Sequence, residues 1–233
     1  MVSIAGGTYE MGQSDGEFDE KPVHLVTLSD FYIGKYEVTV AEYRLFCEKT
    51  ERPMPEEPAW GWTATHPIIN TSWYDAMAYI SWINQQTGEN YRLPTEAEFE
   101  YVIREGGKPG TFPWGGGMPN ENVADESHKA VSSRRVWEGY DDGYMYTSPV
   151  GTFPANLLGV HDINGNIWEW VSDWHDEFGA DPVTDPKGPS GGTNKVGKGA
   201  SFNADPWHSR TASRDFVSPD FKKPGFRLAK VGK

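Results

Sequence analysis

The sequence predicts a single α+β domain over residues 1–233 with little regular secondary structure. Helix signals occur only in the first half of the chain, whereas the second half alternates short apolar runs with turn residues. The chain contains 26 Gly and 17 Pro, which favour turns. Ten Trp, eleven Tyr and eleven Phe supply bulky core side chains, so a disordered chain is excluded. No linker and no internal repeat divides the chain.

Three capping boxes predict three short helices. In a capping box, a Ser or Thr side chain accepts a hydrogen bond from the amide three residues later, and the acidic residue there returns the contact. The boxes pair Thr39 with Glu42, Ser72 with Asp75, and Thr95 with Glu98. They predict helices over 41–50, from Ser72 to just before Gly88, and from Thr95 to a stop at Gly106. Cys47 is expected to be a small buried apolar side chain of the first helix.

After Gly106 no periodic pattern remains, but the irregular stretches carry six of the tryptophans. We therefore expect packed loops there, and one short terminal strand that begins at Phe226.

Charge and composition exclude several classes of protein. Lys plus Arg total 21 against 34 Asp plus Glu, a net charge of -13, which argues against nucleic-acid binding and disfavours acidic partners. No run approaches the roughly 18 apolar residues of a transmembrane helix, and residues 1–11 lack signal-peptide features. The chain is therefore expected to be either cytosolic or the mature part of an exported protein. A single cysteine allows no internal disulfide and no Cys-rich zinc site.

Motifs in a fixed order run along the whole chain. They are GGTYEMG (6–12), KPVHLVTLSDFYIGKYEVT (21–39), RLPTEAEFEY (92–101), PWG (113–115), GVHDINGNIWEWVSDW (159–174), KGASF (198–202) and GFRLA (225–229). Together they resemble the formylglycine-generating enzyme family, also called sulfatase-modifying-factor domains. The resemblance implies a variant of the C-type lectin fold, with a small twisted sheet, two or three helices and many structured loops. It also suggests that Arg92 and Glu96 are buried or half-buried and paired within the fold.

The same resemblance implies structural Ca²⁺, a cation that takes six to eight oxygen ligands including backbone carbonyls. One set of ligand positions comprises Asp162, Gly165, Ile167 and Glu169, and the other comprises Asn122, Val123, Asp142 and Tyr144. An alternative stays open, in which Asp162 and Glu169 only cap local loop amides.

The chemistry for which the family is named is not expected here. It oxidises a substrate cysteine with a copper ion held by two thiolates, and the resemblance places Ala204 and Ser209 at the thiolate positions. Copper(I) requires soft sulfur ligands, which neither residue supplies. We therefore expect no copper and no formylglycine-generating activity. A thiol-independent oxidoreductase or tautomerase of the same superfamily remains an alternative.

A second resemblance concerns the C-terminal segment. Variable proteins of diversity-generating retroelements use this domain to display a diversified segment between a GGSW-like motif and GFR, positions that KGASF and Phe226–Arg227 occupy here. The resemblance implies a ligand-binding segment over 202–221, where aromatic and small polar residues mix as in a paratope. The expected ligand-binding residues are Asn203, Asp205, Trp207, His208, Ser213, Asp215, Phe216, Val217, Ser218, Asp220 and Phe221. Trp60, Trp62 and His175 are candidates to extend this face.

The leading prediction is a non-catalytic, monomeric ligand-binding protein whose partner is a protein or a glycan. Its segment 202–221 is expected to tolerate substitution with little loss of stability. Display of a ligand site favours an exported or cell-surface protein, such as a lipoprotein without its leader, although a cytoplasmic location stays open. The thiol-independent enzyme and a surface lipoprotein domain that serves an export or motility apparatus are the alternatives.

Overall fold

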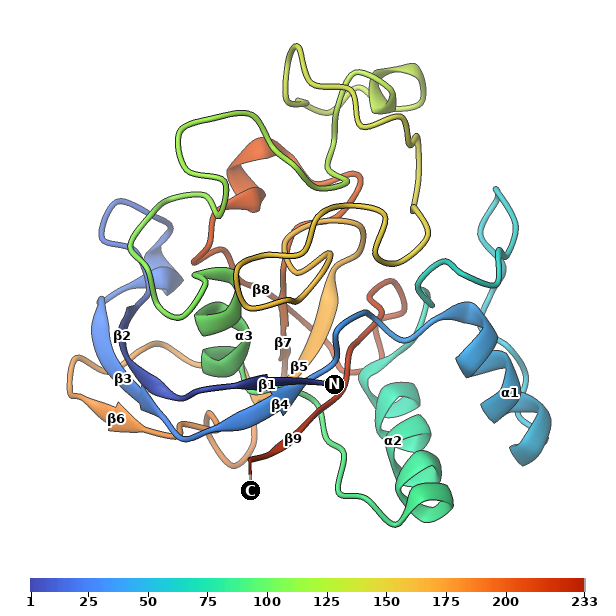
Figure 1. Ribbon diagram of the computed structural model, residues 1–233, viewed down its shortest axis with the longest axis horizontal. Helices are drawn as coiled ribbons and strands as arrows, with labels where there is room; N and C mark the ends of the chain where they lie inside the picture. Colours follow the sequence, from blue (N-terminus) through green and yellow to red (C-terminus); the bar gives the residue numbers. More distant parts are fainter. Residues whose placement is uncertain (233) are drawn as a thin grey trace.

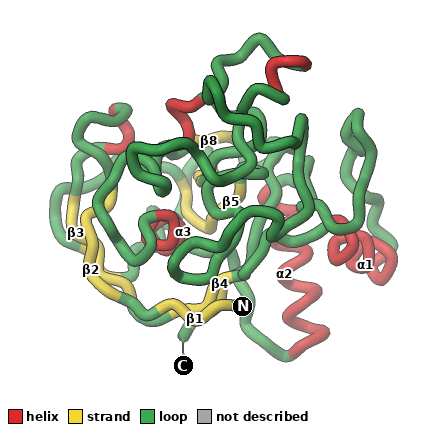
Figure 2. The backbone as a smooth tube through the Cα atoms, turned by 45° about the horizontal axis from the view of Figure 1, so that its top comes forward, coloured by secondary structure: helices red, strands yellow, loops and turns green. Residues whose placement is uncertain are grey.

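The computed structural model describes residues 1–232 and confirms an α+β fold with little regular secondary structure. Loops and turns account for most of the backbone in Figure 2. The α-helices of the described residues are α1 (Val40–Thr50), α2 (Trp73–Thr87) and α3 (Glu96–Ile103), and each begins at a predicted capping box with both reciprocal bonds formed. The short 3-10 helices are η1 (Phe18–Glu20), η2 (His128–Ala130) and η3 (Pro206–Ser209). None of the helices in residues 1–232 is long and apolar enough to span a bilayer.

The strands within residues 1–232 form three small sheets of three strands each instead of the single small sheet expected. The first is antiparallel and contains β1 (Val2–Ile4), β4 (Phe31–Ile33) and β9 (Ala229–Val231). In the second, β2 (Gly7–Met11) runs antiparallel to β3 (His24–Leu28), which pairs in parallel with β6 (Val183–Thr184). The third is antiparallel and contains β5 (Glu169–Trp174), β7 (Lys195–Lys198) and β8 (Asp215–Val217). Figure 1 shows α3 in the middle of the molecule and α1 with α2 at its right side.

The predicted terminal strand exists, but it begins at Ala229 and not at Phe226. Residues 225–228 bond to several different partners before a regular ladder can start. The carbonyl of Phe226 accepts from the amide of Val38 at 2.9 Å, and the carbonyl of Leu228 accepts from Gly34 at 2.6 Å.

Two apolar clusters form the core. The first lies between α3 and the sheets and includes Tyr9, Val26, Phe99 and Val196. The second surrounds α1 and α2, where Phe46, Tyr79, Trp170 and Phe226 pack together. Cys47 belongs to this second cluster and is buried, as predicted. Burial of aromatic side chains in two centres stabilises a fold whose strands are only two to six residues long.

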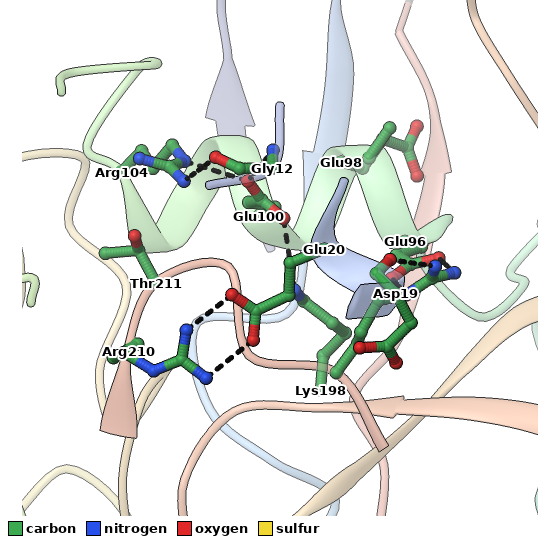
Figure 3. A network of polar contacts seen from close by, with 12 residues as sticks. Gly12, Asp19, Glu20, Glu96, Glu98, Glu100, Arg104, Lys198, Arg210 and Thr211 are labelled. Atoms are coloured by element: carbon green, nitrogen blue, oxygen red, sulfur yellow. Dashed lines mark hydrogen bonds and ion pairs between the residues drawn. The ribbon is translucent and has the colours of Figure 1, made fainter. Parts of the chain in front are cut away.

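Buried ion pairs connect α3 to β7 and to the loop directly before β8 (Figure 3). Glu100 accepts from Arg104 at 2.9 Å and from Lys198 at 3.1 Å, and all three side chains are buried. Arg92 pairs with Glu98 and Glu96 pairs with Arg214, so the expectation that Arg92 and Glu96 are paired within the fold is confirmed.

Candidate functional site

A cleft of about 440 Å³ opens where the KGASF motif meets the long loops before β5. Its walls come from distant parts of the chain, and they include Trp60, His128, Tyr146, Trp168 and Phe202. Concave sites of this size with apolar and aromatic walls are the usual form of a ligand-binding pocket.

The aromatic side chains of the cleft hold one another in place. The rings of Trp60 and Tyr146 stack at 4.2 Å with an angle of 8° between their planes. Phe202 lies edge-on to both, at 5.6 Å from Trp60 and 6.1 Å from Tyr146, and His128 approaches Phe202 at 5.9 Å. Trp60 remains 36% exposed. A rigid, partly exposed aromatic group of this kind offers contact area to a ligand at a low cost in conformational entropy.

The charged groups of the cleft are cationic. Arg134 and Lys223 line it, whereas none of the described residues that line it is Asp, Glu or Cys. His128 is its remaining basic side chain, and its Nδ1 lies 3.3 Å from the carbonyl of Met145.

The structure distributes the predicted ligand-binding residues over several places. Asn203 lines the cleft, whereas Asp205 and Trp207 line a second cleft of about 470 Å³ next to it. Phe216 stacks on His175 at 3.8 Å in a different place. His208, Ser218 and Asp220 are exposed, and Asp215 is half-buried in β8. Val217 and Phe221 are half-buried and pack against the second core cluster.

Residues 209–214, in the middle of the predicted segment, are buried. Arg210 makes a bidentate pair with Glu20, and Arg214 makes one with Glu96 at 2.7 Å for both bonds. Ser213 lies between these two arginines and is 8% exposed. Its side chain is therefore part of the interior and not of a continuous binding face.

Four carboxylates surround one buried guanidinium next to the cleft loops. Arg227 donates to Glu169 at 2.7–3.0 Å, and its Nη2 also donates to the carbonyl of Asp162 at 3.1 Å. Both oxygens of Glu37, one oxygen of Asp162 and one of Glu121 are buried without a hydrogen-bond partner among the described residues. Burial, with the neighbouring charge of Asp162, raises the pKa of Glu37 and that of Glu121 well above the usual range. One guanidinium does not neutralise this group if all four carboxylates are ionised.

Loop 121–124 adjoins these residues. The amide of Asn166 donates to the carbonyl of Asn122 at 2.7 Å. A Cβ on Gly165 would lie 2.7 Å from the Cβ of Glu121, so only glycine permits this approach. Asp142 accepts from the amides of Val123 at 3.1 Å and Tyr144 at 2.7 Å, and burial raises its pKa to about 7.

Comparison with known proteins identifies the domain. The family described as "Sulfatase-modifying factor enzyme 1-like domain" matches residues 1–231. The chain belongs to this family. The formylglycine-generating enzyme of Thermomonospora curvata is 32% identical, over 98% of this chain and 92% of that protein.

Two solved structures of similar proteins extend over the whole domain. PvdO from Pseudomonas aeruginosa superposes with a TM-score of 0.81 at 30% identity, covering 99% of this chain and 94% of the other. Treponema denticola variable protein 1 superposes with a TM-score of 0.75 at 25% identity, covering 100% and 95%. The family predicted from the sequence motifs is therefore confirmed.

The two residues that the resemblance places at the family's thiolate positions contain no sulfur. Ala204 is half-buried at one of them, and Ser209 is fully buried at the other. Cys47, the only cysteine of the sequence, points its Sγ toward the carbonyl of Pro53 at 3.5 Å in the second core cluster. The chain therefore cannot supply the two thiolates that formylglycine formation requires.

The first family calcium position contains one unpartnered carboxylate oxygen, on Asp162, whereas both oxygens of Glu169 already accept from Arg227. The unpartnered oxygens of Asp162 and Glu37 are carboxylate donors, the type that Ca²⁺ prefers. Within residues 1–232, however, no three His, Cys, Asp or Glu side chains converge closely enough to hold a metal by themselves. A cation here would therefore also need backbone carbonyls, as the family pattern implies for Gly165 and Ile167. Glu37 escaped the sequence analysis because it lies far from the DINGNIWE motif, although it occurs in the YEVT motif.

The second position offers fewer free donors. Both oxygens of Asp142 already accept from backbone amides, whereas the side-chain oxygen of Asn122 is buried without a partner. No spacing in the sequence relates the cleft residues His128, Arg134, Tyr146 and Lys223, so sequence patterns did not predict them.

Proposed function

We propose that this chain is a non-catalytic ligand-binding protein and that the cleft around Trp60, Tyr146 and Phe202 receives its ligand. The observation that carries the proposal is the stacked aromatic group, which lies at the start of the segment that variable proteins use for display. The likeness to Treponema denticola variable protein 1 over the whole chain supports the same role.

The chemistry of the walls favours binding over catalysis. None of the described lining residues is a carboxylate or a thiol, so general-base and nucleophilic roles would fall to His128 or a serine. A ligand-binding role needs only shape, apolar area and a few polar contacts, all of which the cleft offers. The alternative, a thiol-independent oxidoreductase or tautomerase, rests on the likeness to proteins named formylglycine-generating enzyme and PvdO.

Structural calcium is the second part of the proposal. Asp162 and Glu169, with the carbonyls of Gly165 and Ile167, would hold one ion, and Glu37 would lie close enough to add its charge. A divalent cation there would offset the buried carboxylate charge that Arg227 leaves uncompensated. The set of Asn122, Val123, Asp142 and Tyr144 would hold a second ion. We further propose that the protein acts as a monomer outside the cell or on its surface, where a display protein meets its partner.

The binding proposal can be tested by selection. Wild-type protein is used to select binders from a displayed random-peptide library and to probe a glycan array. Every binder is then tested against Trp60→Ala and Phe202→Ala, whose folding is checked by thermal melting. Tyr74→Ala serves as the matched control, because Tyr74 is an exposed aromatic residue of α2 that does not line the cleft.

We expect binders whose affinity falls at least tenfold in both cleft variants and is unchanged in Tyr74→Ala, since central aromatic anchors carry most interface energy. Binders that tolerate both cleft substitutions would place the ligand site elsewhere. If selection returns no binder from either library, the binding proposal fails and the enzyme alternative replaces it.

A further inference from the structure

The cleft differs in charge from the rest of the protein. The chain has 34 acidic and 21 basic residues. Two cations and no described carboxylate line the cleft. The net charge of -13 disfavoured acidic partners when only the sequence was considered, but a ligand responds to the local potential at its site. The local charge of this site favours an anion.

Neither cation of the first cleft pairs with a carboxylate of the described residues. The carbonyl of Lys223 accepts from the amide of Asn70 at 3.1 Å, which fixes the backbone there. The amide of Arg134 donates to the hydroxyl of Ser132 at 3.2 Å, and its Nη1 approaches the carbonyl of Asn203 at 3.4 Å. Across residues 1–232, no ion pair includes either Arg134 or Lys223. The Nζ of Lys223 lies 5.8 Å from the centre of the Phe221 ring, a contact that leaves its charge uncompensated. Both charges can therefore contact an anionic ligand.

The second cleft extends the same site. Arg134 lines both clefts, and the second adds Lys129, Arg135 and the exposed ring of Trp207, together with the carboxylates of Asp205 and Glu138. Lys129 pairs with Glu126 at 2.8 Å, so among the described residues Arg134 is the cation of the second cleft without an ion pair. Arg135 pairs with Asp205 at 2.9 Å, and this contact holds loop 129–136 against the start of the predicted ligand segment. Two adjoining clefts that share a cation suit an elongated ligand better than a compact one.

The apolar walls indicate which elongated anion fits. Ile69, Val131 and Ile167 line the first cleft beside the aromatic residues. Aliphatic side chains of a peptide bury apolar area against such walls, whereas sugar hydroxyls would lose hydrogen bonds to water there.

We propose that the ligand is an acidic segment of a protein. Its aromatic or aliphatic side chains occupy the first cleft, and its carboxylates contact Arg134 and Lys223. This inference rests on the proposed function, because it assigns a ligand class to the same cleft.

Two labelled peptide pools of equal length test the proposal. Both carry aromatic and aliphatic residues at the same positions, and they differ only in having Glu or Gln at the polar positions. Binding kinetics are measured at low and physiological salt with wild type and with Arg134→Gln combined with Lys223→Gln. Lys49→Gln is the matched control, since Lys49 is an exposed cation of α1 outside both clefts. Trp60→Ala reports whether binding uses the cleft, and heparin is added as a polyanionic glycan competitor.

We expect the Glu pool to bind more tightly than the Gln pool. Its association rate should fall roughly tenfold in the double variant at low salt, and the difference should shrink as salt is added. Lys49→Gln should behave as wild type.

Equal binding of both pools, lost in Trp60→Ala, would overturn the acidic preference while leaving the proposed function intact. Heparin that binds through Arg134 and Lys223 more tightly than the Glu pool would replace the peptide with a glycan. If neither pool binds any form of the protein, the peptide inference is overturned, and the selection with Trp60→Ala and Phe202→Ala decides the proposed function separately.

Discussion

Residues 202–208 and residues 209–214 are consecutive in the chain, but they serve different purposes. The first stretch contributes exposed or half-buried side chains to the two clefts, including Phe202, Asn203 and Trp207. The second is buried, and its arginines pair with Glu20 of η1 and Glu96 of α3. The difference shows that a segment with the composition of a binding loop can contain buried, structural residues in its middle. Residues 209–214 are called the buried strip below. We therefore expect only the exposed parts of 202–221 to tolerate substitution with little loss of stability, and not the whole segment.

The largest effect should come from the buried strip. Arg214→Met leaves Glu96 buried without its partner, which should destabilise the protein by about 3–5 kcal/mol. Arg135→Met is the matched control, because Arg135 forms an ion pair of similar length with Asp205 but its side chain is 82% exposed. The control should cost about 0–1 kcal/mol. Urea unfolding measures the stability of both variants. Equal losses in the free energy of unfolding would show that the buried pair of Arg214 and Glu96 contributes no more to stability than the exposed pair of Arg135 and Asp205.

Removal of calcium should also lower the stability of the protein. If Asp162 and Glu169 hold Ca²⁺, chelation should lower the melting temperature, since calcium at about 100 times its Kd stabilises the native state by about 2.7 kcal/mol. Asp162→Asn should remove this calcium dependence, whereas Asp220→Asn, at an exposed carboxylate, should retain it. A melting curve of the wild type that chelator leaves unchanged, with no metal found by elemental analysis, would contradict the site.

The stability of the protein should also depend on pH through Asp173 of β5, which contacts α3 next to the buried pair of Glu96 and Arg214. This buried carboxylate accepts from the amide of Glu96 at 3.0 Å, and burial, followed by the charge of Glu96, raises its pKa to about 7. Because the folded-state pKa is raised, the native state binds the proton more tightly than the unfolded state. The stability that the protonated carboxyl contributes is therefore present at low pH and is lost as pH rises from about 4 to about 7.

Asp173→Asn should flatten this part of the pH profile, and the difference from wild type should reach at most about 4 kcal/mol. Urea unfolding at several pH values provides the measurement, and subtraction of the two profiles removes other titrating groups such as Asp142. Parallel profiles for the two proteins would mean that the pKa of Asp173 is the same in the native and unfolded states.

Local signals in the sequence were sufficient for the helices and for the family. Each capping box is formed within four residues, so Thr39, Ser72 and Thr95 marked the starts of α1, α2 and α3. The strands are short, and several are held by distant pairing such as that of β4 with β9, which a local pattern does not encode.

Neither the buried strip nor the cleft could be predicted from the sequence, and the reason is the same for both. Arg210 lies 190 residues from Glu20 and Arg214 lies 118 residues from Glu96. The cleft likewise combines Trp60, Tyr146, Phe202 and Lys223, which meet only in the folded protein. Composition could indicate that 202–221 contains exposed aromatic residues, but it could not separate the exposed from the buried ones.

The smallest effect is expected where the exposed part of the segment is changed. His208, Phe216, Ser218 and Asp220 are exposed, with Phe216 at 37%, although its ring stacks on His175. Their combined substitution by Ala should cost no more than roughly 0.5 kcal/mol per residue, the usual range for surface positions.

Val217 and Phe221 provide the comparison within the same segment, because both pack against the second core cluster. Substituting these two by Ala should cost about 2–4 kcal/mol together, less than for fully buried side chains because each is half-buried. Thermal and urea unfolding of the fourfold and twofold variants decide between the two expectations. A fourfold variant that loses as much stability as the twofold variant would show that Phe216 and its neighbours belong to the scaffold. The segment would then be structural along its whole length, and the contrast between its exposed and buried parts would disappear.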